Sequence, residues 1–222
     1  MEWYEEQPWI VGCNFLPSTA INQVEMFQPD TYDPETIKRE LGWAKDLGFN
    51  ALRVYLHDIL WQPEVREGFL KSFDSFLDIC SSLDMRCIIV FFDDCHWDHV
   101  IALGGQPPRI TGVHKSGWLK SPGRTFLDVY HGGTIAEEDR TRLKDYVQEI
   151  LRRFHSDSRV LMWDIYNEPG TSNTISLLVD AWAWAQEIRP SQPLTGCHYG
   201  SGEEYQDIQS DNSDVISYHC YD

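Results

Sequence analysis

The run Trp163–Gly170, with the sequence WDIYNEPG, closes an apolar segment with a carboxamide, a carboxylate and a helix-breaking proline. Asn167 can hold a hydroxyl group and Glu168 can move a proton, as a site for general acid–base catalysis requires. Polar or aromatic functional groups also end four other apolar segments: Arg53 with His57, Asp93 with Asp94, His198 with Tyr199, and His219 with Tyr221. A site made from these groups needs a fold that gathers the ends of five segments.

The segments that carry these groups alternate with amphipathic ones. We predict strands at residues 9–16, 50–57, 85–94, 159–169, 192–200 and 213–222, and helices at 33–48, 65–83, 137–157 and 172–190. Asp33 is the expected N-cap of the first helix, with Pro34 at its first position and Gly48 at its end. Residues 95–136 show no sustained period and are predicted as a long loop, and a short polar connection is expected between the last two strands.

Apolar strands that alternate with helices favour a parallel α/β sheet buried on both faces. A doubly wound sheet and a (β/α)8 TIM barrel both fit this order. The glycine-rich phosphate-binding motifs G-x-G-x-x-G and G-x-x-x-x-G-K-[ST] follow none of the predicted strands, which weakens the nucleotide-binding version of the first. Polar groups at the ends of five strands favour the barrel, because its active site collects residues from many strand ends.

Composition limits the partners that the chain can have. A net charge of -17 argues against binding to nucleic acid or to an anionic membrane surface, and the sequence has no apolar run of membrane-spanning length. The start MEWYEEQPWIVG lacks the features of a signal peptide, so we expect a cytoplasmic protein with a single domain over residues 1–222. The six cysteines lack C-x-x-C spacing and are expected to be reduced core thiols, with no metal or other cofactor.

With Asn167-Glu168-Pro169 at the end of the fourth strand, the chain resembles the clan A glycoside hydrolases, and most closely their family 5, cellulase-like group. The resemblance rests on VGCNFLPS at the first strand, ALRVYLHD at the second, WDIYNEP at the fourth and DVISYHCYD at the sixth. It implies a (β/α)8 barrel that hydrolyses O-glycosyl bonds, with Glu168 as general acid/base. It also implies that Asn167 holds the sugar 2-hydroxyl, that Arg53 supports the nucleophile, and that His219 and Tyr221 line the site.

The same resemblance implies that the nucleophile is a second glutamate at the end of a seventh strand, whereas the predicted strands number six. We therefore expect an incomplete barrel of about six βα units. Retaining glycosidases place two carboxyl groups about 5–5.5 Å apart, and the acid has a raised pKa. Neutral Tyr and His neighbours with partial burial are expected to raise the pKa of Glu168, and a nearby Arg would lower it.

Each of these residues also has a purely structural interpretation. Glu168 could be a surface carboxylate at a loop start, Asn167 a turn former before proline, and Arg53 the partner of a buried acid such as Asp164. Asp93 and Asp94 could reach the cleft, although the resemblance puts the nucleophile elsewhere.

The segment FDDCHWDH, residues 92–99, offers a second set of candidates. His96 and His99 could bind a metal only if they lay on a helix, so lining of a substrate cleft is favoured over a metal site, with an ordinary loop histidine as the third choice. Trp97 and Trp118 are candidate platforms for the apolar faces of sugar rings, and His198 is a further candidate for substrate binding. Trp182 follows a helical apolar stripe and is expected in the core.

Two hypotheses follow. The first is a glycosidase, expected to be retaining, that acts on a β-linked oligo- or polysaccharide and whose nucleophile is supplied by a C-terminal complementing segment. The second is a non-catalytic incomplete barrel that keeps a carbohydrate-binding cleft. Because a six-stranded parallel sheet leaves two unpaired edges, self-association is also expected unless a further segment covers them.

Overall fold

The computed structural model describes residues 2–98, 101–170, 173–200 and 202–221, and contains one sheet of six parallel strands. The strands are β1 (Gly12–Asn14), β2 (Ala51–Tyr55), β3 (Arg86–Asp93), β4 (Val160–Asn167), β5 (Leu194–His198) and β6 (Val215–Tyr218). All six lie inside the segments predicted as strands.

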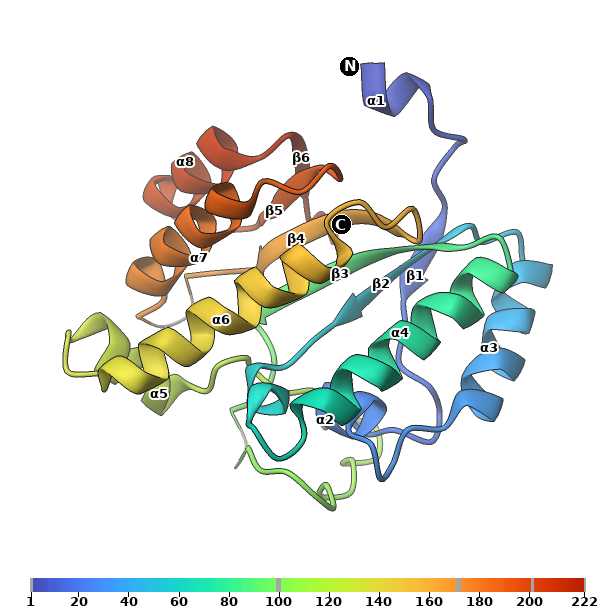
Figure 1. Cartoon of the computed structure of the whole chain (residues 1–222), viewed down its shortest axis with the longest axis horizontal. Helices are drawn as coiled ribbons and strands as arrows, with labels where there is room; N and C mark the ends of the chain where they lie inside the picture. Colours follow the sequence, from blue (N-terminus) through green and yellow to red (C-terminus); the bar gives the residue numbers. More distant parts are fainter. Residues whose placement is uncertain (1, 99–100, 171–172, 201, 222) are drawn as a thin grey trace.

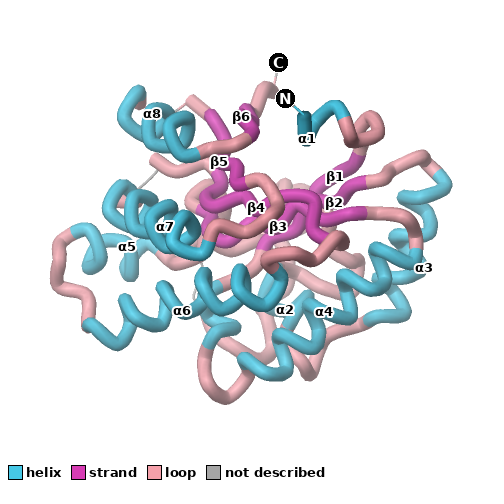
Figure 2. The backbone as a smooth tube through the Cα atoms, turned by 45° about the horizontal axis from the view of Figure 1, so that its top comes forward, coloured by secondary structure: helices cyan, strands magenta, loops and turns pink. Residues whose placement is uncertain are grey.

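The strands are paired in chain order, β1 to β6, so each hydrogen-bonds to its neighbours in the sequence of strands. The sheet curls, and the helices pack along its outer side (Figures 1 and 2). Sequential parallel order with helical crossovers is the topology of a (β/α)8 barrel, and six strands make an incomplete one. Within the described residues, β1 and β6 are the two ends of the sheet.

The helices include the four that were predicted and several that were not. They are α1 (Glu2–Glu5), α2 (Gln23–Phe27), α3 (Pro34–Asp46), the 3₁₀ turn η1 (Asp58–Trp61), α4 (Arg66–Ser82), α5 (Arg124–His131), α6 (Glu137–Phe154), α7 (Ile175–Ile188) and α8 (Glu203–Asn212). The prediction of a structureless loop over 95–136 was wrong at α5, and the predicted polar connection between the last strands is helix α8. Both helices are short, so their apolar periodicity is brief.

Local chemistry explains where the predicted helices begin and end. Asp33 caps α3 as predicted, because its side chain accepts a hydrogen bond from the backbone amide of Thr36 at 3.1 Å. Gly48, just after α3, has a φ of +86°, which glycine adopts without steric cost. On α4, the residues Phe69, Phe73 and Phe76 recur at helical spacing and are fully buried, so they fix which face of the helix meets the sheet.

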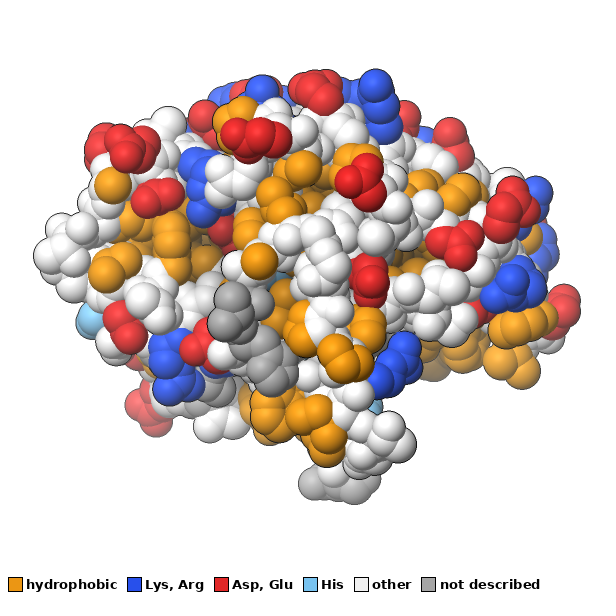
Figure 3. All heavy atoms as spheres, turned by 90° about the horizontal axis from the view of Figure 1, so that it is seen from below, with side chains coloured by type: hydrophobic (Ala, Val, Ile, Leu, Met, Phe, Trp, Pro, Cys, Tyr) orange, Lys and Arg blue, Asp and Glu red, His pale blue; other side chains and the backbone are white. Residues whose placement is uncertain are grey.

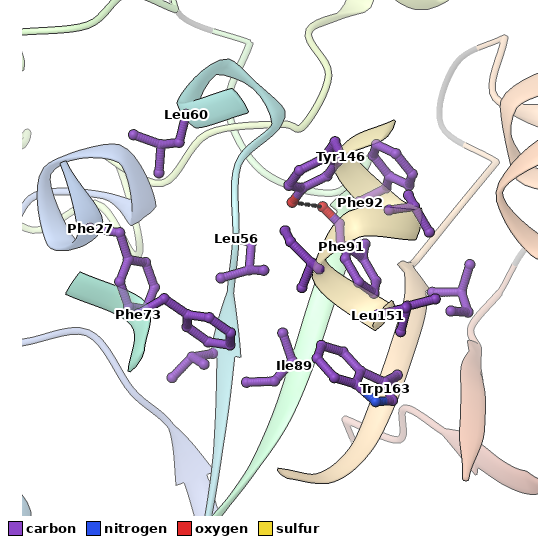
Figure 4. Close-up of a cluster of buried hydrophobic side chains, with 14 of the residues drawn as sticks. Phe27, Leu56, Leu60, Phe73, Ile89, Phe91, Phe92, Tyr146, Leu151 and Trp163 are labelled. Carbon is purple, nitrogen blue, oxygen red and sulfur yellow. Dashed lines mark hydrogen bonds between the residues drawn. The ribbon is translucent and has the colours of Figure 1, made fainter. Parts of the chain in front are cut away.

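The core between the sheet and the helices is rich in aromatic side chains (Figure 4). Phe91 of β3 stacks on Trp163 of β4 with ring centroids 5.4 Å apart. Tyr146 of α6 contacts Phe91 edge-on and donates its hydroxyl to the Phe91 carbonyl at 3.1 Å. Such packing holds β3 and β4 rigidly. It therefore also fixes the positions of the polar groups at their carboxyl ends.

Helix α8 is held against β5 by one buried glutamine. Gln209 donates to the Tyr166 carbonyl at 3.1 Å and accepts from the indole nitrogen of Trp182 at 2.7 Å. A Cβ atom on Gly196 would lie 2.1 Å from the Gln209 side chain, so any larger residue there would displace this glutamine from its position. Trp182 is buried, which confirms its predicted place in the core.

The surface reflects the acidic composition. Figure 3 shows Asp and Glu side chains scattered between apolar patches on the face of the molecule seen from below. None of the helices among the described residues is long and apolar enough to cross a membrane. The six cysteines are free thiols, but Cys13 and Cys220 are exposed, so the expectation of core thiols holds for only part of the set.

Candidate functional site

Glu168 lies directly after β4 in a strained conformation. Its φ is +45°, a left-handed value that non-glycine residues adopt at an energetic cost and that is concentrated at functional sites. Its backbone amide donates to the sulfur of Cys197 at the end of β5, at 2.8 Å. Beyond it, the amide of Gly170 donates to the Thr174 hydroxyl at 3.1 Å. These contacts turn the Glu168 side chain toward the segment that follows β6.

Two side chains after β6 hold the Glu168 carboxylate. Nδ1 of His219 lies 2.5 Å from Oε1 of Glu168, and the Tyr221 hydroxyl donates to the same oxygen at 2.8 Å. The ring of Tyr199, after β5, contacts the ring of Tyr221 edge-on at 5.7 Å. The structure thus brings three strand ends together at Glu168, as a barrel predicts.

These contacts control the charge of Glu168. Burial alone raises its pKa, but hydrogen bonds from His219, Tyr221 and Cys95 stabilise the carboxylate and lower the pKa from 4.5 to about 2. The expectation that Tyr and His neighbours would raise the pKa was therefore wrong for this arrangement, because both side chains point at the carboxylate.

Removal of these contacts provides a test. In the double variant His219→Ala/Tyr221→Phe, the pKa of Glu168 is expected to rise from about 2 toward 4.5, because the charged form loses two contacts while its burial remains. The depressed pKa adds stability that is present above pH 4.5 and lost as the pH falls toward 2, so the variant should also lose this pH dependence. Carboxyl ¹³C NMR, assigned with Glu168→Gln, measures the pKa directly.

The control for this measurement is Tyr218→Phe, which removes a hydroxyl from an exposed ring on β6. It should leave the titration of Glu168 unchanged. A double variant whose Glu168 still titrates near 2 would show that other groups hold the charge.

Arg53 lies on β2 and forms an ion pair with Asp164 of β4, as its structural interpretation predicted. Its Nη2 atom is 2.6 Å from Oδ2 of Asp164 and 2.8 Å from Oδ1 of Asn167. Burial would lower the pKa of Arg53, but the Asp164 carboxylate outweighs this effect and raises it, so the guanidinium stays charged. Oδ1 of Asp164 is buried without a hydrogen-bond partner, so Arg53 is its main source of compensation.

Asn167 hydrogen-bonds both to Arg53, which is paired with Asp164, and to Asp93 at the end of β3. Its carboxamide oxygen accepts from Arg53 and from the Tyr55 hydroxyl, at 3.3 Å for the latter. Its nitrogen donates to Oδ1 of Asp93 at 2.6 Å and lies 3.1 Å from the sulfur of Cys95. These contacts fix the orientation of the carboxamide next to Glu168. Its predicted contact with a sugar hydroxyl stays a prediction.

Asp93, at the end of β3, is buried and accepts a hydrogen bond from the Asn167 carboxamide. Burial raises its pKa, but electrostatic and hydrogen-bond interactions with His96 and a hydrogen bond from Asn167 outweigh it, and the pKa is lowered. Nδ1 of His96 is 2.8 Å from Oδ2 of Asp93. Asp94, the other acid considered for the cleft, is instead paired with Lys120 at 2.7 Å.

The remaining predicted site residues lie in three different settings. His96 is buried against Tyr55 and Trp118, with ring centroids 5.3 and 5.0 Å away. Trp118 is only 9% exposed, so little of its ring is left to stack on a sugar as predicted. Trp97 is 42% exposed.

The prediction grouped His198 with the site, but its side chain lies 2.9 Å from the Ser210 hydroxyl of α8. Successive side chains of a strand point to opposite faces, and on β5 it is Cys197 that faces Glu168.

Asp93, Cys95 and His96 bring three potential metal-ligand atoms within 4.8 Å of one another. Asp93 is already bonded to Asn167 and His96, and burial raises the pKa of the Cys95 thiol, which disfavours the thiolate that a metal requires. We therefore assign this group to the support of Asn167 and Glu168. His99, the other predicted candidate ligand, lies outside the described residues.

Three further residues at the site were not among the predicted ones: Tyr55, Cys95 and Cys197. Tyr55 follows Arg53 by two positions and so shares its face of β2, a signal that strand periodicity contained. Cys95 lies in an irregular segment, where sequence spacing does not indicate which way a side chain points, and Cys197 lies on β5 next to the predicted His198.

Comparisons with known proteins bear on the family and the fold of the chain. The family model described as Cellulase (glycosyl hydrolase family 5) matches residues 14–193 of the chain. A search of curated protein sequences gave no match.

Several solved structures share the fold. A glycoside hydrolase family 5 mannosidase from Rhizomucor miehei superimposes with a TM-score of 0.67 at 17% identity, over 97% of this chain and 58% of that one. An exo-β-1,4-mannosidase from Opitutaceae bacterium strain TAV5 gives 0.65 at 17% identity, over 96% and 38%. An endo-1,4-β-mannanase from Eisenia fetida gives 0.59 at 13% identity, over 98% and 70%. The chain thus spans little more than half the length of the Rhizomucor enzyme.

Proposed function

Because the chain belongs to glycosyl hydrolase family 5, we propose that it forms part of a retaining glycosidase for β-linked glycans, with Glu168 as the general acid/base. The observation that carries this proposal is the Glu168 carboxylate, held at the carboxyl ends of three strands by His219 and Tyr221. The names of the structural neighbours make β-mannosides the first substrates to test.

Retaining hydrolysis needs a second carboxylate as nucleophile, about 5–5.5 Å from the acid. Within the described residues, Asp93 and Asp164 are the buried acids of this network, and both are already engaged by Asn167 or Arg53. We therefore assign the nucleophile to a polypeptide segment outside residues 1–222. The chain together with that segment is called the complete enzyme below.

The second carboxylate also explains how Glu168 could act as an acid. With a pKa of about 2 it is ionised at neutral pH and has no proton to donate. A nearby like charge raises a carboxyl pKa, and so does exclusion of water by a bound sugar. Glu168 would then protonate the leaving oxygen while the nucleophile bonds to the anomeric carbon, and as a base would deprotonate the water that cleaves the glycosyl ester.

The low pKa of Glu168 also favours the second hypothesis, an incomplete barrel that binds carbohydrate without cleaving it. Such a protein would bind the same glycans through Asn167, His219 and the aromatic residues nearby, and Glu168 would serve only as a hydrogen-bond acceptor.

Turnover separates the two functions, and the stereochemistry of the product tests the retaining mechanism. The complete enzyme, incubated with an aryl β-mannoside or another β-glycoside that it accepts, is expected to release the β-anomer first, as ¹H NMR in the first minutes can show. First release of the α-anomer would exclude the retaining mechanism. Binding of glycans without turnover would support the non-catalytic hypothesis.

A further inference from the structure

A hollow lies beside the site, between the segment after β1 and the long loop that precedes α5. Its volume is about 280 Å³, and its lining includes Asn14, Ser18, Arg109, Lys115 and Trp118. This volume is close to the lower limit of about 300 Å³ for ligand pockets and suits a single sugar ring. Asn14 connects the hollow to the site, because its side-chain oxygen lies 3.5 Å from Nη1 of Arg53.

The charge of this hollow is opposite to that of the protein. Two of the twelve residues that line it are cations, Arg109 and Lys115, and none of the twelve is acidic. Two carboxylates accept hydrogen bonds from backbone amides of lining residues: Glu40 from Ser18 at 3.0 Å and Glu25 from Ile21 at 2.7 Å. In a chain of net charge -17, a carboxylate-free hollow with two cations is an unusual concentration of positive charge.

Lys115 is held in place at this hollow. Its ammonium nitrogen lies 4.5 Å from the centre of the Trp118 ring, a cation–π contact. Its φ is +50°, a conformation that costs energy for a lysine. Burial lowers its pKa, and attraction to nearby acidic groups offsets this only in part, so the pKa lies below the usual value for lysine. A partly buried ammonium at the wall of a hollow can bind an anionic group of a ligand.

We propose that this hollow binds the carboxylate of a hexuronate unit in the glycan, with Lys115 and Arg109 as its counter-charges. The proposal rests on the proposed function and names the class of substrate: a β-linked glycan with an acidic sugar next to the bond that is cleaved. Neutral sugars would gain little from two cations, whereas a uronate would form charge-assisted hydrogen bonds with them. The net charge of the protein repels anions, so their binding requires such local compensation.

A matched pair of ligands tests this inference in the complete enzyme carrying Glu168→Gln, so that neither ligand is hydrolysed during the measurement. One is a β-1,4-linked manno-oligosaccharide, and the other is the same oligosaccharide oxidised to the uronate at its primary alcohols. Isothermal titration calorimetry at low salt should show about tenfold tighter binding of the oxidised ligand, and 0.5 M salt should reduce that preference. Lys115→Met should remove the preference and change the affinity for the neutral ligand by less than about twofold, and Arg109→Gln should reduce it in part.

Lys71→Gln, which removes an exposed cation of α4, is the matched control and should preserve the preference. If the neutral ligand binds and the oxidised one binds no tighter, the inference is wrong while the proposed function stands. A Lys115→Met variant that weakens both ligands equally would make Lys115 a wall residue and also overturn it. If a sulfated oligosaccharide binds tighter than the oxidised one, the uronate assignment is wrong. If neither ligand of the pair binds, the proposed function fails with it.

Discussion

Replacement of Glu168 by glutamine is expected to lower the turnover of a β-linked oligosaccharide by about 10²–10⁴-fold in the complete enzyme, the usual contribution of general acid–base catalysis. Glutamine has nearly the same shape and still accepts the hydrogen bond that Tyr221 donates to Glu168. It cannot, however, donate a proton to the leaving oxygen. The variant should therefore fold like the wild type and bind substrate, while its kcat is strongly reduced.

Steady-state kinetics on an oligosaccharide, with circular dichroism to confirm folding, measures this effect. The matched control is Glu204→Gln, an exposed position near the start of α8, which should retain the wild-type kcat. A Glu168→Gln enzyme that keeps more than about a tenth of the wild-type kcat on this substrate would contradict the acid/base assignment.

Removal of Arg53 is expected to have the largest effect on stability. Arg53→Met takes away the guanidinium that compensates Asp164, whose side chain is 2% exposed and has one oxygen without a partner. Breaking a buried ion pair from one side typically costs about 3–5 kcal/mol, because the remaining charge stays buried. Urea unfolding of the variant and the wild type measures this loss.

The double variant Arg53→Met/Asp164→Asn distinguishes charge from packing. It removes both charges, so it should be more stable than Arg53→Met alone. Arg39→Met removes an exposed cation 3.7 Å from Glu40 and should change stability by no more than about 0.5 kcal/mol. A loss below about 1 kcal/mol for Arg53→Met would mean that water or another group compensates Asp164.

Much of this fold follows from residue patterns that depend on local sequence. The six strands, the four long helices and the cap at Asp33 were predictable because periodic burial and capping are local effects. Helix α8 escaped prediction because Gln209, a polar residue, makes its central buried contacts. No apolar stripe marks such a helix.

The site was predictable to the extent that strand ends meet in a barrel. Glu168, His219 and Tyr221 do converge, and the Arg53–Asp164 pair forms as expected. The side on which a residue projects depends on register, which is why Cys197, and not the predicted His198, faces Glu168. The pKa of Glu168 depends on the direction in which His219 and Tyr221 point, which is a property of tertiary structure.

In the proposed reaction, Glu168 transfers a proton to the departing oxygen. The most direct test of this step compares two substrates of one sugar in the complete enzyme, a β-glycoside with a poor, alkyl leaving group and one with an activated, dinitrophenyl leaving group. We expect Glu168→Gln to lose at least about tenfold more of its rate of glycosyl-enzyme formation on the poor leaving group, because the activated one departs without a proton. Equal losses on the two substrates would contradict the claim.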